Sequence, residues 1–356
     1  MKYKRILFLL LIPISFILTQ IAKHNIYFAE FYAVKIYPIF SFGIGRITSL
    51  VPFSIAENLI LFLVAVFIIY LINITVKTIK YKSSRYIKFF IINILSAASI
   101  IYFLFVLFCG INYYRNEFTV YSGLEIKESS KDELIELCND LIINANELKQ
   151  NINKDKNGGT LLFDDNYYET SKRAKKSFNN ISQQYEILKG HYVLPKPVKL
   201  SREMSYTRIT GVFFPFTFES NVNVDIPDYQ IPSTMCHELI HQKGFMREDE
   251  ANFISYLACV NSGYDDFAYS GTMLALTYSM NALYKEDYEA FENLYAKYSD
   301  GVLNDLKISN DYWKQFETKT AEISNKVNDT YLKANNQEDG VKSYGRMVDL
   351  LLSYYR

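Results

Sequence analysis

Hydrophobic residues gather in three uncharged runs near the N-terminus, at about residues 6–21, 58–76 and 89–111. A helix needs about 20 apolar residues, each rising about 1.5 Å, to cross a bilayer. The second and third runs reach that length, and the first nearly does. The first run also follows basic residues, as in a signal peptide, but TQIAKH after it is a poor cleavage site. We therefore predict a membrane anchor over residues 1–112 with three transmembrane helices.

Basic residues predict the orientation of these spans. They lie before the first run (Lys2, Lys4, Arg5) and between the second and third runs (Lys77, Lys80, Lys82, Arg85, Lys88). By the positive-inside rule both regions are cytoplasmic, which places residues 113–356 outside the cytoplasm. The aromatic segment at 25–55 is either a surface loop or, as we prefer, an interfacial segment at headgroup level.

The rest of the chain shows mostly helical periodicity. We predict helices over 130–149, 168–188 and from 232 to the end with a break at 263–266, including amphipathic segments at 329–333 and 344–352 and a turn at Gly340. Residues 191–199 contain two prolines and should be extended, and 205–225 is strand-like. The predicted fold is mainly α with a small β-sheet, following three transmembrane helices.

Composition excludes several classes of protein. Lys+Arg 38 against Asp+Glu 38 gives zero net charge, so a globally basic nucleic-acid binder is excluded and no nucleic-acid partner is expected. The four cysteines (Cys109, Cys138, Cys236, Cys259) are too few for a disulfide scaffold, although one bridge is possible. The expected partners are a lipid bilayer and a peptide or protein substrate, and the sequence does not indicate an oligomeric state.

The chemical signal lies in residues 237–241, which read HELIH, the HExxH pattern. On a helix His237 and His241 share one face, so both imidazoles can bind the same Zn²⁺. Glu238 lies beside them and can take a proton from water. The chain has only four histidines, which makes a chance match rare. We therefore predict one Zn²⁺ per chain, with Glu238 as a catalytic residue.

A catalytic zinc needs a third protein ligand and an open position. Gly244 can reverse the chain, and a second helix then starts with three acids, which a helix N-terminus also favours on its own account. We favour Glu248 as the third ligand, because it shares a helix face with Asn252, which would orient a histidine. Glu250, on the other side of that helix, is the alternative ligand.

These residues carry a resemblance to gluzincin-type zinc metallopeptidases, which use HExxH and a downstream Glu. The gap from His241 to Glu248 is shorter than in most gluzincins. The chain also resembles an uncharacterised family of bacterial membrane-anchored proteins. That likeness rests on three segments: Thr210 to Asn223 (TGxxxPFT-E-N-N), His237 to Phe253 (HExxHQxGFxREDEANF) and Asn328 to Leu352. It covers most of the chain and implies an extracytoplasmic zincin-like hydrolase domain at 113–356, with no particular substrate.

The resemblance also implies how a peptide would bind. Zincins pair an extended substrate with an edge strand, here Ile209 to Phe214, and the stretch Phe216 to Asn223 would line the cleft unless it is ordinary aromatic core. The substrate-binding residues expected on this basis are Gly211, Phe214, Phe216, Glu219 and Asn223. Glu219 would hold the substrate N-terminus or be solvated. A tyrosine after the ligand helix, Tyr269 or Tyr278, would donate to the oxyanion, and Tyr269 is the favoured choice.

Two functions follow from these observations. The first is a membrane-anchored, zinc-dependent metallopeptidase that hydrolyses peptide bonds outside the cytoplasm. The second is a non-catalytic sensor or binding protein of zincin fold for peptide or cell-wall fragments. The intact Glu238 favours the enzyme. Intramembrane proteolysis is disfavoured, because His237 lies in a polar stretch far beyond the last apolar run.

Overall fold

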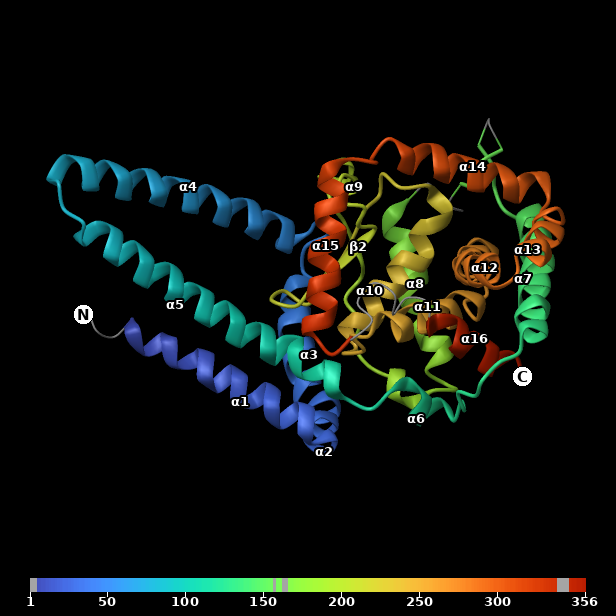
Figure 1. Cartoon of the computed structure of the whole chain (residues 1–356), viewed down its shortest axis with the longest axis horizontal. Helices are drawn as coiled ribbons and strands as arrows, with labels where there is room; N and C mark the ends of the chain where they lie inside the picture. The colour runs from blue at the N-terminus through green and yellow to red at the C-terminus, as the bar shows by residue number, and fades with distance from the viewer. Residues whose placement is uncertain (1–4, 156–157, 162–165, 338–345) are drawn as a thin grey trace.

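The computed structural model describes residues 5–155, 158–161, 166–337 and 346–356. Its described part is mainly helical with one small sheet, as predicted. Long helices project from a helical body in which the sheet lies close to their base (Figure 1). Gly340 and Tyr344, with the predicted turn and the start of the last helix, lie outside the described residues.

Three of the long helices are long and apolar enough to cross a membrane. The first comprises a 3-10 turn at Ile6–Leu10 and α1 at Leu11–His24, the second is α4 at Ile55–Tyr81, and the third is α5 at Arg85–Phe108. They correspond to the three predicted runs. The second is longer at both ends than the predicted run. At its start, the hydroxyl of Ser54 accepts a hydrogen bond from the amide of Glu57 and caps the helix early.

The segment between the first two spans is helical, so its interpretation as a surface loop was wrong. It contains α2 at Ile26–Phe31, a π-helix at Tyr32–Ile36 and α3 at Tyr37–Thr48. The hydroxyl of Tyr37 donates to the carbonyl of His241 at 3.2 Å, and the hydroxyl of Thr48 donates to the carbonyl of Thr217 at 3.1 Å. This segment therefore packs directly on the body, and its predicted position at the headgroup level stays a prediction.

The body consists of helices that mostly follow the predicted pattern. They are α6 Phe118–Ser122, α7 Lys131–Asn151, α8 Tyr167–Ile181, α9 Ser201–Ser205, α10 Ile231–Gln242, α11 Glu248–Val260, α12 Asp265–Glu286, α13 Tyr288–Tyr295, α14 Asp300–Lys314, α15 Lys319–Ala334 and α16 Met347–Tyr355. A capping box between Ser130 and Glu133 starts α7. The predicted helix at 168–188 ends early, at Ile181, and a short 3-10 turn follows at Glu186–Leu188.

The sheet has three short strands in the order β1-β3-β2. β1 (Lys196–Pro197) pairs in parallel with β3 (Glu219–Val222), and β2 (Gly211–Phe214) pairs antiparallel with β3, with Gly211 opposite Val222. β2 therefore forms one edge, as the predicted edge strand at 209–214 required. The strand-like stretch at 205–225 contains both β2 and β3.

Helices α10, α11 and α12 form the centre of the core. Their apolar side chains, including Leu239, Ile240, Phe253 and Leu276, are fully or almost fully buried. Because α10 is buried on nearly all sides, the histidines that it carries are held by packing rather than by a mobile loop. All four cysteines are free and buried, so the possible disulfide does not form.

Candidate metal centre

Helix α10 brings the two histidines of the HELIH motif together. Their ring centroids lie 4.7 Å apart, and their Nε2 atoms are 3.0 Å apart. Pro232 lies in the first turn of this helix, where a missing N–H costs nothing. The two imidazoles therefore point their Nε2 atoms at one location, as expected for residues one helical turn apart.

Gly244 turns the chain from α10 to α11. Its φ of +87° belongs to the left-handed region that favours glycine. The turn places Glu248, the first residue of α11, against both histidines: Oε2 is 3.1 Å from Nε2 of His237, and Oε1 is 3.7 Å from Nε2 of His241. His237, His241 and Glu248 therefore form a cluster of possible metal ligands whose ligand atoms all lie within 4.8 Å of one another.

The separations fit a tetrahedral zinc ion. Bonds of about 2.0–2.1 Å to one tetrahedral ion would place its ligand atoms about 3.3 Å apart. The three measured separations, 3.0, 3.1 and 3.7 Å, lie around that value. Imidazole nitrogen and carboxylate oxygen are also the donor types that zinc accepts. Geometry and chemistry of the donors therefore both suit the ion.

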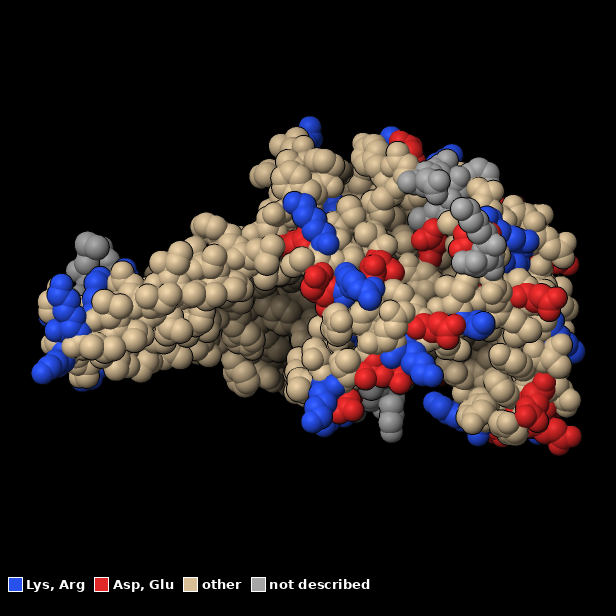
Figure 2. Space-filling model, turned by 90° about the horizontal axis from the view of Figure 1, so that it is seen from above, with Lys and Arg blue, Asp and Glu red and all other residues tan. Residues whose placement is uncertain are grey.

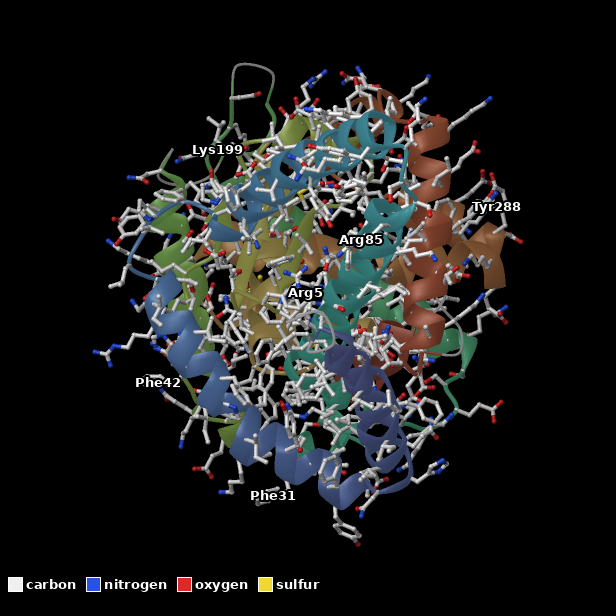
Figure 3. All side chains as sticks on the ribbon, turned by 90° about the vertical axis from the view of Figure 1, so that its left-hand side faces the viewer. Arg5, Phe31, Phe42, Arg85, Lys199 and Tyr288 are labelled. Carbon is white, nitrogen blue, oxygen red and sulfur yellow. The ribbon has the colours of Figure 1, made fainter. Side chains whose placement is uncertain are left out.

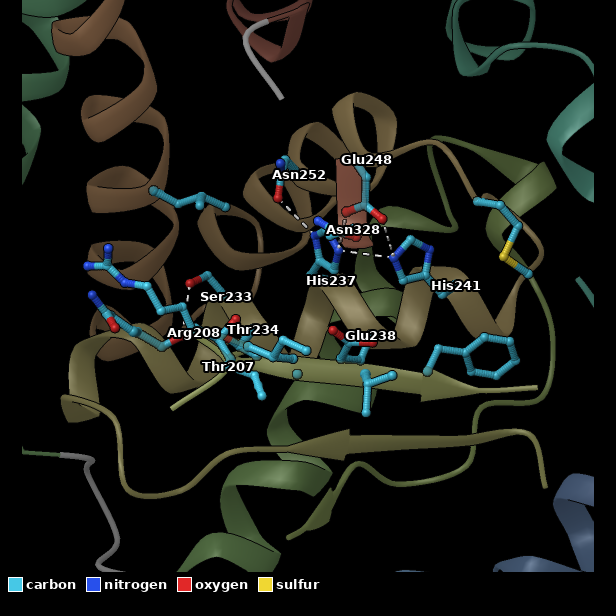
Figure 4. Close-up of a pocket in the computed structure, with 18 of the residues that line it drawn as sticks. Thr207, Arg208, Ser233, Thr234, His237, Glu238, His241, Glu248, Asn252 and Asn328 are labelled. Carbon is cyan, nitrogen blue, oxygen red and sulfur yellow. Dashed lines mark hydrogen bonds and ion pairs between the residues drawn. The ribbon is translucent and has the colours of Figure 1, made fainter. Parts of the chain in front are cut away.

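The outer nitrogens of the histidines have partners that fix the rings. Nδ1 of His241 is 2.8 Å from the carbonyl of Phe245, and Nδ1 of His237 is 2.8 Å from Oδ1 of Asn252 (Figure 4). A carbonyl oxygen only accepts, so Nδ1 of His241 carries its hydrogen and Nε2 presents a lone pair. Such outer contacts orient the ligands of metal sites. Asn252 thus lies where the sequence predicted a partner for a histidine.

The carboxylates and burial set the protonation of the cluster. Burial, followed by the charge of His237, lowers the pKa of His241 to about 4. Burial opposes the protonation of His237, but its hydrogen bond and charge interaction with Glu248 outweigh burial and raise the pKa to about 9. In the protein without metal, a proton on His237 therefore balances the charge of Glu248, and a cation among the three ligands would replace that proton.

Glu238 lies on the opposite side of the histidine pair, facing β2 (Figure 4). A Cβ on Gly211 would be 2.5 Å from Oε1 of Glu238, so only glycine allows the strand to approach this closely. Burial raises the pKa of Glu238 to about 8, against a lowering by His237 and a backbone hydrogen bond with Phe213. Oε2 of Glu238 is buried and finds no hydrogen-bond partner among the described residues. Such an atom calls for a water or a ligand.

A cavity of about 770 Å³ opens beside these groups. Its walls come from α10, from β2 and the turn after it, from α12, from α15 and from the end of α5. Gly211, Phe214 and Phe216 are part of the lining, as predicted for substrate-binding residues. The cavity is large enough for several residues of a peptide.

Four further predicted site residues lie elsewhere. The carboxylate of Glu250 is buried and accepts a hydrogen bond from the amide of Phe118, so it does not approach the histidines. The hydroxyl of Tyr269 donates to Asp305 at 2.6 Å inside the core, and this tyrosine does not line the cavity. Both side chains point away because they occupy the core-facing sides of their helices.

Glu219 and Asn223 are also absent from the cavity wall. Buried Glu219 lies 2.5 Å from Nζ of Lys196 and accepts hydrogen bonds from the amides of Ile55 and Ala56, at the start of α4. The side-chain amide of Asn223 donates to the hydroxyl of Ser205 and to the carbonyl of Ile209, which holds the loop before β2. The prediction that Glu219 and Asn223 bind substrate was therefore wrong, because both have structural partners.

Tyr278, the less favoured of the two tyrosines considered as oxyanion donors, lies on the cavity wall, and its hydroxyl accepts a hydrogen bond from Asn252 at 3.3 Å. The cavity also contains residues that the sequence did not single out as site residues. Asn328 and Tyr331 of α15, and Phe105 and Cys109 near the end of α5, also line it. The resemblance segment that begins at Asn328 was the signal available for α15, but it carried no information on which element α15 would cover.

Comparison with known proteins places the chain in a family. The sequence model of one family, described as "Protein of unknown function (DUF3810)", matches residues 32–352. No curated protein and no solved structure matches the chain. The match begins after the first apolar helix and spans the other two and almost the whole body, so the chain belongs to the DUF3810 family.

Proposed function

We propose that this protein is a membrane-anchored, zinc-dependent peptidase that acts outside the cytoplasm. The observation that carries the proposal is the convergence of His237, His241 and Glu248 beside a buried carboxylate, Glu238, with an unpartnered oxygen. An HExxH helix with a third ligand and an adjacent glutamate is the arrangement of zincin-type hydrolases. The unpartnered oxygen of Glu238 favours an enzyme over a binding protein, because it is available to a water molecule.

His237, His241 and Glu248 would hold the zinc ion, and Asn252 and the carbonyl of Phe245 would keep the rings in place. When bound, zinc supplies Lewis acidity, which polarises a carbonyl and makes water more acidic. All remaining parts of the reaction fall to the side chains of this protein.

Glu238 is the proposed general base and acid. As a carboxylate it accepts a proton from the attacking water, whose oxygen forms a bond to the carbonyl carbon of the substrate. The C–N bond then breaks, and Glu238 passes the proton to the leaving amine. The second proton of the water moves from the new acid group to the amine, so the products are a carboxylate and an ammonium group, and atoms and charge balance.

The edge strand β2 is the proposed binding site for the peptide backbone. The backbone amide of Asn223 donates to the carbonyl of Thr210 at 2.8 Å. Hydrogen-bonded and non-hydrogen-bonded pairs alternate in an antiparallel ladder, so the backbone groups of Gly211 and Phe213 point away from β3. The backbone hydrogen bond of Phe213 with Glu238 agrees with that direction. An extended peptide would pair with the open edge of β2.

Tyr278 replaces Tyr269 as the proposed donor to the oxyanion. Its hydroxyl oxygen accepts a hydrogen bond from Asn252, and its hydroxyl hydrogen has no acceptor among the described residues, so it can donate into the cavity. A positioned donor of this kind stabilises the charge that develops on the carbonyl oxygen.

The proposed topology rests on charge. Lys and Arg gather at the far tip of the spans, which are otherwise free of charge along their visible length (Figure 2). This tip carries the loop between α4 and α5, with Lys82 and Arg85. With that tip in the cytoplasm, the body and its cavity lie on the outer side.

The direct test uses the full chain, purified in detergent and loaded with zinc. A library of fluorescence-quenched peptides is expected to be cleaved by the wild-type protein and not by Glu238→Gln, which keeps all three ligands. General-base loss should lower turnover about 10²–10⁴-fold or more. Equal cleavage by both proteins would point to a contaminating protease and reject the proposal.

A further inference from the structure

The wall of the cavity includes the end of a candidate span that adjoins the body. Phe105 lies in the last turn of α5, Cys109 follows the end of that helix, and Tyr113 lies in the 3-10 turn at Gly110–Tyr114. All three line the cavity together with His237 and Glu248. A helix rises about 1.5 Å per residue, and Phe105 is three residues from the end of α5. This part of the cavity therefore lies within a few ångströms of the end of the span.

The second span begins on the other side of the same site. Glu219 of β3 binds the first amides of α4, those of Ile55 and Ala56, and β2, next to β3, forms a wall of the cavity. Figure 3 views the molecule along the spans, from the end that carries Arg5 and Arg85. In that view the strands and α10 are visible in the space framed by α3, α4 and α5. The site therefore lies between the outer ends of the second and third spans.

Helix α15 presents an apolar stripe at this level. Ile323, Val327 and Tyr331 follow at i, i+4 and i+8, which places them on one side of the helix. The ring of Tyr331 packs edge-on against Phe105 of α5, and its hydroxyl is 3.0 Å from that of Tyr113. The other two side chains are 62% and 63% exposed, although both are aliphatic. The stripe thus continues from the end of α5 along the surface beside the cavity.

The chain that leads into α4 is apolar and exposed as well. Leu50 is 80% exposed, and Ile47 and Phe53 are also exposed. Ser54, the residue before α4, donates a hydrogen bond to Asn221 of β3, so this chain is fixed to the sheet that borders the cavity. Exposed aliphatic and aromatic side chains at the end of a span are stabilised by insertion at the boundary between headgroups and acyl chains.

From this arrangement we infer that the cavity opens at the surface of the bilayer, and that the substrate is a membrane-anchored protein, cut in an extended segment directly outside its anchor. The inference rests on the proposed peptidase function. An extended chain rises about 3.3 Å per residue, so a site at this level would cut about two to eight residues from the anchor. Confinement to the same membrane would also raise the effective concentration of the substrate.

The test places enzyme and substrate in the same membrane. The zinc-loaded full chain is reconstituted into vesicles of phosphatidylethanolamine and phosphatidylglycerol with single-span proteins that carry randomised outer segments of about 30 residues. The same segments, released from their span, serve as the soluble comparison at equal total concentration. Mass spectrometry of the products gives the cleavage positions. We expect anchored segments to be cut at least about tenfold faster, near the span.

The outcomes separate the two proposals. Cleavage of soluble and anchored segments at equal rates, or cuts spread evenly along the segment, would support a peptidase but overturn the inference on its substrate. If the wild-type protein and Glu238→Gln both fail to cleave soluble and anchored segments, the peptidase function and the inference on its substrate are both rejected. Cleavage of anchored segments near the span, absent in Glu238→Gln, is the supporting result.

A pair of variants on α15 adds a second measurement. Val327→Asp puts a charge on the apolar stripe, whereas Lys326→Asp puts the same side chain at a neighbouring exposed position outside it. If the stripe contacts the bilayer, Val327→Asp lowers the ratio of anchored to soluble cleavage several-fold and Lys326→Asp leaves that ratio unchanged. Identical ratios in the two variants would contradict the membrane contact of the stripe.

Discussion

At the scale of single residues, the position of His237 depends on one amide. Oδ1 of Asn252 lies 2.8 Å from Nδ1 of His237, and Asn252 follows Glu248 by one turn of α11. The ligand and the residue that orients the neighbouring ligand therefore come from the same helix face. Such a contact fixes both the ring and the nitrogen that faces the metal.

We expect Asn252→Ala to lower zinc affinity about 10–100-fold, because the ring of His237 loses its outer partner. The measurement is a competition titration of the full chain with a chromophoric chelator. Asn261→Ala, just beyond the end of α11, is the control, since Asn261 bonds to the carbonyl of Leu257 far from the ligands. If both variants bind zinc as tightly as the wild type, Asn252 does not position His237 for zinc binding.

The two tyrosines of α12 should respond differently to loss of the hydroxyl. Tyr278→Phe is expected to lower kcat about 10²-fold with little change in KM or melting temperature, since its hydroxyl faces the cavity. Tyr269→Phe removes a buried hydrogen bond to Asp305, so it should lower the melting temperature and leave kcat nearly unchanged in the folded protein. The reverse pattern would return the catalytic role to Tyr269.

The sequence was informative at this scale where chemistry is local. The HExxH spacing predicted the paired histidines, and the helix face shared by Glu248 and Asn252 predicted their common position at the site. Tyr269 and Glu219 were misplaced because their partners, Asp305 and Lys196, lie far away in the sequence. A hydrogen-bonding side chain in one segment does not reveal which distant element will bury it.

At the scale of elements, a buried ion pair connects the sheet with a candidate span. Lys196 of β1 and Glu219 of β3 lie 2.5 Å apart, and both are almost fully buried. Lys196 also donates to the carbonyl of Thr48 at the end of α3, and Glu219 accepts from the first amides of α4. The pair therefore joins two strands of the sheet to both ends of the connection between α3 and α4.

We expect Glu219→Gln to destabilise the chain by about 3–5 kcal/mol, because it leaves the charge of Lys196 buried without its partner. The double variant Lys196→Met with Glu219→Gln should recover part of that loss. Glu169→Gln is the matched control, since it breaks an exposed pair with Lys172 and should change stability by less than about 1 kcal/mol. Thermal unfolding in detergent measures all three variants. Equal melting temperatures for Glu219→Gln and Glu169→Gln would contradict a stabilising role of the buried ion pair.

Element boundaries followed the sequence where caps or turns mark them. The capping box at Ser130, the glycine turn at Gly244 and the break near Gly263 all fall where the pattern indicated. The helical nature of residues 26–48 was missed, because its aromatic pattern also fits a segment at the membrane interface. Its contacts with His241 and Thr217 are long-range in sequence and had no local signal.

At the scale of the whole molecule, the predicted boundary at residue 112 does not separate two independent packing units. Tyr37, Thr48 and Ser54 hydrogen-bond across it to His241, Thr217 and Asn221 of the body. We therefore expect residues 113–356 expressed alone to melt at least several degrees below the full chain and to bind zinc more weakly. Circular dichroism melting of both proteins checks this, and equal melting temperatures would show that the anchor adds no stability.

The most direct test of the central claim is the zinc content of the purified full chain in detergent, measured by elemental analysis beside His237→Ala and Glu238→Gln. We predict one zinc per chain in the wild type and in Glu238→Gln, and loss of zinc in a folded His237→Ala. Absence of zinc from a folded wild-type protein supplied with zinc, or full retention of zinc by His237→Ala, would contradict this prediction.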